Sequence, residues 1–398
     1  MRHKQPEQAV ILAGGLGTRL RPISNTIPKP MIKFHGKPFL EYLVEQVKNQ
    51  GITKILLLLG YLPEIVQNYF QDGEKFGVSI EYSITEVEND TGTRLKKAKD
   101  KIDDLFYMMY CDNYCPLDFY DMYKSFTKND LWGQLTVYGN KDKYTKDNIR
   151  IRDSIVEVYD KTRKMENLSG VEIGYAIFKK HIIDLIPEGN VNFEKTVYPG
   201  LVKSRKLGGF LTDHRYYSVS SHERLHLTKQ FLLRSKAIIL DRDGVLNEKA
   251  PKAQYITNWD EYKWLPGARE SLKLLKENGF TIIVVTNQAG IARGYMTEKD
   301  LLEIHNKMNN DLKEHDAKID AFYYCPHGWD DNCECRKPKP GMLFQAQRDF
   351  HLDLSKTCFI GDDERDKTAG DQAGCKTLLV DKDNSLSKLI NIILLNLT

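Results

Sequence analysis

The chain has 398 residues, of which 41% are hydrophobic and 28% are charged, and its formal net charge at pH 7 is +3. This length favours two or three domains, and the composition is that of a globular protein with enough apolar residues for complete cores. The small net charge argues against general binding to nucleic acid, and no apolar run is long enough to cross a bilayer. The start of the chain does not have the pattern of a signal peptide, so a cytoplasmic protein without membrane partners is expected.

A glycine-rich loop follows the first predicted strand, Gln8–Leu12. Glycines let backbone N–H groups wrap phosphate oxygens without hindrance from Cβ atoms, and an arginine adds a planar charged fork. The loop matches neither the Walker motif nor Gly-x-Gly-x-x-Gly, and a glycine loop alone is often only a turn. A lysine between two prolines, Lys29, follows shortly after it. The loop residues suited to phosphate are Gly14, Gly15, Gly17, Thr18 and Arg19.

The segments Leu12–Pro22 and Pro28–Met31 together resemble the sugar-1-phosphate nucleotidyltransferases, which join an NTP to a sugar 1-phosphate and release pyrophosphate. The resemblance covers residues 1–220 and implies a Rossmann-like α/β domain. The order of predicted elements agrees, because helices and strands alternate as in a mostly parallel sheet. After the first strand these elements are helix Pro38–Gln50, strand Lys54–Gly60, helix Glu64–Phe70, strand Val78–Ser83 and strand Leu105–Cys111.

The resemblance also implies roles for the nucleotide and its metal. The five loop residues would hold the NTP, and Lys29 would neutralise charge on its phosphates. Gly92, within Thr91-Gly92-Thr93, stands where the family has a base-contacting Gly-Thr. Asp112 comes directly after a predicted strand and matches the aspartate that holds the catalytic Mg²⁺.

For the sugar phosphate, Lys161 matches the lysine that contacts the phosphate, and Glu194 stands where a sugar hydroxyl is accepted. Glu172 is a further candidate, and a lone charge at any of these positions could instead be solvated. In-line attack of the sugar phosphate on the α-phosphorus asks the protein mainly for positioning and charge neutralisation.

One position departs from the nucleotidyltransferase pattern. The family closes with Asp-x-Gly-Thr, whose aspartate is a second metal ligand, whereas this chain has Ser218 there. Serine is a poor replacement for a carboxylate on a hard divalent cation. Either Asp112 and the substrate phosphates hold the metal, or this half is slow, has another substrate, or only binds and regulates.

Residues 221–235 predict one helix with a basic last turn, which would link domain 1–220 to domain 236–398. Because this link is not rich in Gly and Ser, the two domains are expected to pack against each other. The apolar positions of Leu386–Leu395 recur at helical spacing and predict a helix that closes the last core.

Two aspartates, Asp241 and Asp243, follow directly on the apolar run Ala237–Leu240, which predicts a buried strand. Ligands of open α/β sheets bind beyond the carboxyl ends of strands, and buried carboxylates need a metal or a charged partner. An isolated Asp-x-Asp-Gly can equally be a solvated turn. Three later predicted strands, however, also end in polar groups, which are Thr286 with Asn287, Arg336 with Lys337, and Asp362 with Asp363.

These four motifs, in this order over residues 236–381, resemble the haloacid-dehalogenase-like phosphatases, and among them the zinc-loop group of heptose bisphosphate and histidinol-phosphate phosphatases. A second Rossmannoid α/β domain is therefore expected. Asp241 would be the nucleophile, and Asp243 would protonate the leaving group and then activate water. Mg²⁺ would be held by Asp241, the carbonyl of Asp243 and Asp362.

The other motif residues would contact the substrate. Thr286 and Asn287 would bind phosphoryl oxygens, Lys337 would balance charge, and Arg336 would reach a second anionic group. The remaining acids of the last motif, Asp363 and Asp366, would either orient metal-bound water or serve as surface or capping residues.

Four residues with ligand spacing, Cys325, His327, Cys333 and Cys335, predict a closed structural zinc site on the loop that carries Arg336. The alternative is a set of buried cysteines beside an exposed histidine. Clustered cysteines beside a histidine also favour a reducing compartment over a disulfide framework. The other cysteines, Cys111, Cys115, Cys358 and Cys375, are expected to be small core residues.

The fusion of a phosphatase with a nucleotidyltransferase narrows the expected function. Activation of a heptose requires removal of the 7-phosphate from D-glycero-D-manno-heptose 1,7-bisphosphate and transfer of a nucleotide to the remaining 1-phosphate. The hypothesis is that this chain does both, with GTP as the nucleotide by family association alone. The five-residue spacer between His327 and Cys333 favours the alternative, a histidinol-phosphate type of phosphatase.

Overall fold

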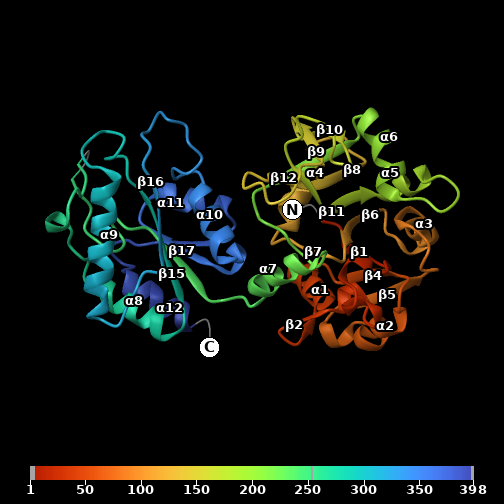
Figure 1. The fold of residues 1–398 in the computed structure, drawn as a ribbon, viewed down its shortest axis with the longest axis horizontal. Helices are drawn as coiled ribbons and strands as arrows, with labels where there is room; N and C mark the ends of the chain where they lie inside the picture. The colour runs from red at the N-terminus through yellow and green to blue at the C-terminus, as the bar shows by residue number, and fades with distance from the viewer. Residues whose placement is uncertain (1–4, 252–253, 396–398) are drawn as a thin grey trace. The chain divides into compact units, whose positions relative to one another are not determined.

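The computed structural model describes residues 5–251 and 254–395. The chain forms two compact units, one ending at Leu232 and the other beginning at Leu233 (Figure 1). Both are α/β units, as the sequence predicts. Among the described residues, no helix combines the length and the apolar character needed to cross a membrane.

The first unit is built on one large sheet, which contains nine strands in the described part of the chain. In spatial order they are β5 (Ser79–Ile84), β4 (Lys54–Leu59), β1 (Gln8–Ala13), β6 (Leu105–Tyr110), β11 (Val171–Lys179), β8 (Gly133–Tyr138), β12 (Leu207–Thr212), β10 (Ile155–Tyr159) and β9 (Ile149–Arg152). The strands from β5 to β6 are parallel, but β11 is antiparallel to both β6 and β8. The expectation of a mostly parallel sheet holds for the strands from β5 to β6 and for β8 with β12, which are parallel neighbours. The sheet is mixed because β11 and β10 run antiparallel to their neighbours.

Smaller elements complete the first unit. Its short strands are β2 (Lys33–Phe34), β3 (Lys37–Pro38), β7 (Asn113–Tyr114) and β13 (Tyr217–Ser218). Its helices are α1 (Phe39–Asn49), α2 (Pro63–Phe70), α3 (Thr91–Lys97), α4 (Phe119–Thr127), α5 (Phe193–Thr196), α6 (Tyr198–Lys203) and α7 (His222–Leu232).

Strand β1 explains why the first unit has a core on each face of its sheet. All six of its residues are buried, with Ala9 and Ile11 in one apolar cluster and Val10 and Leu12 in another. Successive side chains of a strand point to opposite faces, so a strand covered on both sides is apolar at every position. Because β1 and β6 are parallel neighbours, the residues that follow each strand lie beyond the same edge of the sheet.

The helix predicted over 221–235 is shorter than expected and belongs to the first unit by its packing. The ring of Phe231 stacks on Tyr217 with the ring centroids 3.9 Å apart, and the hydroxyl of Thr228 donates to the carbonyl of Ser218 at 2.8 Å. Only residues 233–236 lie between α7 and the first strand of the second unit.

The second unit has a five-stranded parallel sheet. In spatial order its strands are β16 (Ala321–Cys325), β15 (Thr281–Asn287), β14 (Ala237–Leu240), β17 (Cys358–Gly361) and β18 (Lys376–Leu379). Its helices are α8 (Ala268–Glu277), α9 (Glu298–Lys313), α10 (Gly341–Phe350), α11 (Glu364–Gln372) and α12 (Leu386–Leu395). Residues of α8, α9 and α12 share one apolar cluster, and residues of α10 and α11 share the other.

This layering places helices on both faces of the second sheet and makes β14 its central strand. The predicted closing helix is confirmed as α12, where Leu386, Leu389 and Ile390 are buried. All the carboxyl ends of a parallel sheet meet at one edge, so the loops after β14, β15 and β17 lie close together there.

Candidate functional site

The loops at the carboxyl edge of the second sheet gather charged side chains around Asp241, the first residue after β14. The Nζ atom of Lys337 lies 2.9 Å from Asp241 and 2.6 Å from Asp366. All three residues are buried, with exposed fractions of 8% for Asp241, 3% for Lys337 and 1% for Asp366. A charged lysine is stable here only because two carboxylates surround it.

Three carboxylates in this cluster can share a cation. Ligand atoms of Asp241, Asp362 and Asp366 all lie within 4.8 Å of one another. Oδ1 of Asp362 is buried and accepts no hydrogen bond, although Lys249 pairs with the other oxygen at 2.5 Å. An unpartnered buried carboxylate oxygen among three acids suits a hard divalent cation, so the residues present fit Mg²⁺.

The pKa values of Asp241, Asp362 and Lys337 reflect burial together with an excess of negative charge in this cluster. Burial raises the pKa of Asp241 to about 7, Lys337 opposes this rise, and Asp366 and Asp243 add to it. Burial also raises the pKa of Asp362, against the effect of Lys249. Burial alone would lower the pKa of Lys337, but Asp241 and Asp366 outweigh it and raise the value.

Asp243 is held by a set of donors that sequence analysis did not identify. Arg242 donates to both of its carboxylate oxygens at 3.0 Å, Asn247 donates at 2.9 Å, and Gln288 donates at 2.8 Å. Burial acts to raise the pKa of Asp243, but these donors, Arg242 first, hold it below its usual value. Arg242 is fully buried, and its adjacency to both aspartates was the available signal.

The end of β15 brings Thr286 and Asn287 into the same cavity, which Asp362, Arg336 and Lys337 also line. The side chain of Asn287 bonds the backbone of Lys337 in both directions, each at 3.0 Å, so it positions this lysine. Contact of Thr286 and Asn287 with phosphoryl oxygens remains a prediction.

The two remaining acids of the last motif, Asp363 and Asp366, have different roles. Asp363 caps the N-terminus of α11 and pairs with Arg365, as the capping alternative predicts. Asp366 accepts from the backbone N–H of Asp362 at 3.1 Å and holds Lys337, so it belongs to the charged centre itself. Sequence analysis left this role open because a residue one turn into a helix can face either the sheet or the solvent.

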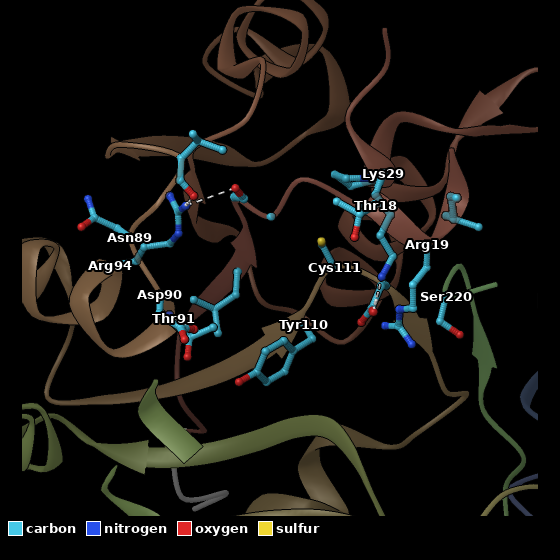
Figure 2. A pocket seen from close by; sticks show the side chains of 18 residues that line it. Thr18, Arg19, Lys29, Asn89, Asp90, Thr91, Arg94, Tyr110, Cys111 and Ser220 are labelled. Carbon is cyan, nitrogen blue, oxygen red and sulfur yellow. Dashed lines mark hydrogen bonds and ion pairs between the residues drawn. The ribbon is translucent and has the colours of Figure 1, made fainter. Parts of the chain in front are cut away.

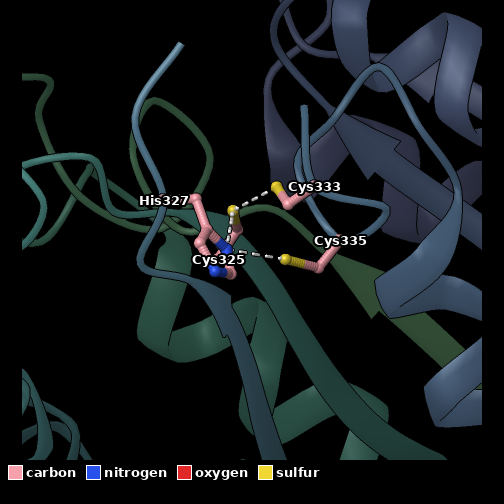
Figure 3. Close-up of side chains that lie close together, drawn as sticks. All are labelled: Cys325, His327, Cys333 and Cys335. Carbon is pink, nitrogen blue, oxygen red and sulfur yellow. Dashed lines mark hydrogen bonds between the residues drawn. The ribbon is translucent and has the colours of Figure 1, made fainter. Parts of the chain in front are cut away.

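The cysteine and histidine cluster assembles beside this centre (Figure 3). Nδ1 of His327 lies 3.6 Å from the sulfur of Cys325 and 3.2 Å from that of Cys335, and the sulfurs of Cys325 and Cys333 are 3.6 Å apart. These are free cysteines, and their four ligand atoms lie within 4.8 Å of one another. Three sulfurs and one imidazole nitrogen at this separation fit a tetrahedral metal site.

The cluster also fixes the residue that follows it. Arg336 donates to the carbonyl of His327 at 3.2 Å, and its guanidinium lies 4.6 Å from the ring centroid of Trp329. Trp329, Arg336 and Arg365 line the same cavity as Asp241, so the loop delivers positive charge to that cavity. The four remaining cysteines are buried, as predicted.

The first unit has a cavity beyond the carboxyl ends of β1 and β6 (Figure 2). All five predicted phosphate-loop residues line it, together with Lys29 and Asp112. The Nζ atom of Lys29 lies 2.5 Å from the Asp112 carboxylate. Figure 2 shows two walls, with Thr18, Arg19 and Lys29 on one side and Arg94 with Asp90 on the other.

Gly92 is not among the residues that line this cavity. Its N–H donates to the carbonyl of Val191 at 3.0 Å, and an added Cβ would lie 2.8 Å from the same oxygen. The glycine is therefore needed for close packing of α3 on the segment before α5. Its neighbour Thr91 and the following Arg94 line the cavity wall, and contact of Gly92 with the nucleotide base stays a prediction.

The predicted sugar-binding residues form a separate group. Lys161 pairs with Glu194 and donates to Asn192 at 3.0 Å. Glu172 accepts from the N–H of Gly174 at 2.6 Å. Burial, followed by the nearby charge of Glu194, raises the pKa of Glu172 to about 8.

Tyr110, at the end of β6, lies between the sugar-binding group and the cavity, because it lines the cavity and interacts with Glu194. Ser218 is buried, and its hydroxyl lies 2.8 Å from that of Ser220, which lines the cavity. The segment stays close to the predicted metal ligand, since the N–H of Val219 donates to the carbonyl of Asp112 at 2.8 Å.

Comparisons with known proteins agree with this division. The Nucleotidyl transferase family matches residues 8–153, and the Polynucleotide kinase 3 phosphatase family matches residues 236–388. HddC from Yersinia pseudotuberculosis is a solved structure with 27% sequence identity and a TM-score of 0.50, and the match covers 57% of this chain and 99% of that chain.

Relatives of the second unit are more similar in sequence. The D-glycero-beta-D-manno-heptose-1,7-bisphosphate 7-phosphatase of Bordetella bronchiseptica is 40% identical over 154 residues, which are 39% of this chain and 85% of that protein. The D-glycero-alpha-D-manno-heptose-1,7-bisphosphate 7-phosphatase of Campylobacter jejuni is 38% identical over 148 residues, which are 37% of this chain and 83% of that protein. The chain therefore belongs, through its second unit, to the family of D-glycero-D-manno-heptose-1,7-bisphosphate 7-phosphatases, and it joins this phosphatase to a nucleotidyl transferase domain.

Proposed function

We propose that the chain carries out two successive steps on one sugar. At Asp241 it would hydrolyse the 7-phosphate of a D-glycero-D-manno-heptose 1,7-bisphosphate. At the cavity of Lys29 and Asp112 it would then transfer a nucleotidyl group, from GTP, to the heptose 1-phosphate. The observation that carries the proposal is the buried Asp241–Lys337–Asp366 centre, in a unit that shares 40% identity with a heptose bisphosphate phosphatase.

In the first half of the phosphatase reaction, a carboxylate oxygen of Asp241 attacks the phosphorus, and the bond from phosphorus to the sugar oxygen breaks. Asp243 gives a proton to the departing sugar oxygen. Lys337, 2.9 Å from Asp241, keeps this nucleophile oriented and offsets its charge. Mg²⁺, held by Asp241 and Asp362 with the Asp243 carbonyl, would reduce the repulsion between the carboxylate and the phosphate.

In the second half, water attacks the phosphorus of the aspartyl-phosphate and the bond to Asp241 breaks, which restores the carboxylate and releases phosphate. Asp243 takes the proton from this water. The donors Arg242, Asn247 and Gln288 stabilise its ionised form, which is the form that a base requires. The proton that Asp243 takes from water here is the one that it would give to the sugar oxygen in the next turnover.

The metal cluster on the adjacent loop would bind zinc through Cys325, His327, Cys333 and Cys335. Zinc would act through geometry, because Arg336 follows the last ligand directly and Lys337 comes next. Arg336, which lines the cavity beside Trp329, would bind the 1-phosphate that remains on the sugar.

In the transferase, an oxygen of the sugar 1-phosphate attacks the α-phosphorus of the NTP, and the bond to pyrophosphate breaks. Lys29 and Arg19 would balance charge on the NTP phosphates, and Lys161 would hold the sugar phosphate. Asp112 would be a ligand of Mg²⁺, with the nucleotide phosphates supplying further oxygens in place of the acid that Ser218 replaces.

The proposal is tested by product analysis. Purified protein is mixed with Mg²⁺, the heptose 1,7-bisphosphate and each of the four common NTPs, and the products are identified by mass spectrometry. Phosphate release followed by GDP-heptose formation is the expected result. A higher kcat/KM for phosphate release from histidinol phosphate would contradict the heptose assignment and support the alternative that the five-residue spacer between His327 and Cys333 favours.

A further inference from the structure

Arg94 is a buried cation in the wall of the first unit's cavity, opposite Lys29 (Figure 2). It lies in α3 and is 3% exposed. Its partners are four carbonyl oxygens and one hydroxyl, none of which is charged. Nη1 donates to the carbonyl of Leu59 at 2.7 Å and the hydroxyl of Thr85 at 2.5 Å, and Nη2 donates to the carbonyls of Gly14 at 3.2 Å, Glu86 at 3.2 Å and Val87 at 3.1 Å.

These acceptors belong to three separate segments, of which two, at Gly14 and at Val87, line the cavity. Gly14 opens the phosphate loop after β1, Leu59 ends β4, and residues 85–87 lie between β5 and α3. A guanidinium presents five N–H donors in a fixed plane, so it can hold several carbonyls at once in one geometry. Arg94 thus joins the phosphate loop to the opposite wall.

Two glycines leave the space that the Arg94 side chain occupies. A Cβ added at Gly14 or at Gly60 would lie closer than 3.0 Å to atoms of the Arg94 guanidinium, which is a separation that real Cβ atoms essentially never show. Neither glycine has a positive φ, so it is the guanidinium that requires glycine at these positions. Glycine is therefore required at position 14 for two reasons, which are access of the backbone to phosphate and space for the Arg94 guanidinium.

Burial lowers the pKa of Arg94, and the nearby carboxylates of Asp90 and Glu88 oppose this shift without cancelling it. Burial of this charge is therefore costly, because the carbonyl dipoles and these acids compensate the cation only in part. A neutral side chain could join two segments without that cost. The buried positive charge becomes favourable when a nucleoside triphosphate binds in the same cavity. The phosphates of this ligand would interact favourably with a fixed cation in the wall.

We propose that Arg94 is a positioning residue for the nucleotide. It holds the phosphate loop and the wall of residues 85–91 at the spacing that the NTP requires, and its charge favours the bound triphosphate. This inference rests on the proposed transferase function. It assigns Arg94 to the NTP and not to the sugar phosphate, whose predicted ligand Lys161 does not line this cavity.

The test compares Arg94→Met, which removes the charge and the fork, with Arg94→Lys, which keeps the charge alone. We expect Arg94→Met to raise the KM for MgGTP about 10- to 100-fold while the KM for heptose 1-phosphate changes less than about 3-fold. Arg94→Lys should recover only part of this loss. Arg152→Met, at a side chain that is 73% exposed, is the matched control.

Gly60→Ala gives an independent way to displace the guanidinium, because Gly60 does not line the cavity. It should raise the KM for MgGTP in the wild-type background and have little further effect in Arg94→Met. Phosphatase activity of the unchanged second unit shows whether each variant protein was obtained in active form, and circular dichroism shows whether it is folded.

Equal increases in both KM values, full recovery by Arg94→Lys, or additive effects of Gly60→Ala and Arg94→Met would each overturn the inference. If wild-type protein neither binds MgGTP by calorimetry nor forms a nucleotide sugar, the proposed transferase function fails instead. A folded Arg94→Met variant with wild-type KM for MgGTP leaves that function intact and refutes the role of Arg94.

Discussion

The predicted metal sites of the two units differ in how many ligands the protein itself supplies for a cation. In the second unit, Asp241, Asp362 and Asp366 bring three carboxylates within 4.8 Å of one another. In the first unit the predicted carboxylate ligand is Asp112 alone, because Ser218 replaces the second acid. The carboxylates of both units are paired with lysines, so the two predicted metal sites differ in the number of acids and not in their pairing. If both centres bind a divalent cation, as proposed, the phosphatase centre would supply more of the ligands itself, and the transferase centre would take more of them from its substrate.

This difference follows from the charge balance that each reaction imposes. In the proposed phosphatase mechanism the nucleophile is a carboxylate, so negative charge meets negative phosphate, and a bound cation would lower that cost. The transferase nucleophile arrives on the substrate, and the triphosphate can bring its own cation.

The largest effects should come from removing the carboxylate on which each site depends. Asp241→Asn cannot form the acyl-phosphate, so phosphate release should fall at least about 1000-fold while transfer is unchanged. Asp112→Asn should have the reverse pattern. Both activities are measured on the same preparation, which makes each site the control for the other.

A surface substitution, Asp260→Asn, should leave both activities near wild type, because Asp260 is exposed and does not line either cavity. Loss of both activities in Asp241→Asn would show a general effect on folding, and persistence of phosphate release would remove Asp241 from the mechanism.

The predicted zinc site should have the next largest effect, and it acts only on the second unit. Cys333→Ser removes one ligand of the cluster, which releases the loop that carries Arg336 and Lys337. We expect loss of bound zinc and a decrease of about 10- to 100-fold in phosphatase kcat/KM. Zinc is measured by mass spectrometry of the metal, and Cys358→Ala, at a buried cysteine outside the cluster, should retain it. Full zinc content in Cys333→Ser would contradict the site.

Sequence reasoning could predict residues that directly follow a strand, because the carboxyl edge of a parallel sheet collects them. Asp241 and Asp362 directly follow β14 and β17, Thr286 lies at the end of β15, and all three line one cavity for this reason. Lys337 lines the same cavity but comes from the long loop after β16, and its place was predicted from the motif resemblance. The assembly of Cys325, His327, Cys333 and Cys335 was also predictable, because their spacing in the sequence is short and local.

Residues that act through another side chain could not be found in this way. Arg94, Arg242 and Gln288 orient a loop or a carboxylate, and only the folded geometry shows which atoms their donors reach. The structure also gives Gly92 a packing role against Val191 that the motif did not predict. The mixed half of the first sheet was likewise missed, since antiparallel pairing between distant strands leaves no local pattern.

A smaller effect is expected from restoring the missing acid in the first unit. Ser218→Asp places a carboxylate beside the backbone of Asn113, its partner in the β7 pairing, next to Asp112. We expect the Mg²⁺ concentration for half-maximal transfer to fall about 10-fold, with the phosphatase unchanged. Ser221→Asp adds the same charge three residues further on and is the control. An unchanged Mg²⁺ requirement would show that the metal does not reach position 218.

The smallest expected effect is on how the free energy of unfolding depends on pH. It concerns Glu172, in the predicted sugar-binding group of the first unit, and does not involve the phosphatase centre. Folding raises the pKa of Glu172 from an ordinary value of 4.5 to about 8, because the carboxyl is buried and close to Glu194. Between these two values the folded chain holds a proton that the unfolded chain releases. The free energy of unfolding should therefore fall as pH rises through this window.

Glutamine cannot ionise, so Glu172→Gln should remove this dependence. From pH 5.5 to pH 8 the variant should gain about 1 to 2 kcal/mol of stability relative to wild type, measured by urea unfolding followed by circular dichroism. Glu166→Gln, at an exposed position, should show no such gain. A constant difference between variant and wild type across this range would mean that Glu172 is already ionised at pH 5.5, and that the buried pair of acids in the first unit is fully compensated by Lys161.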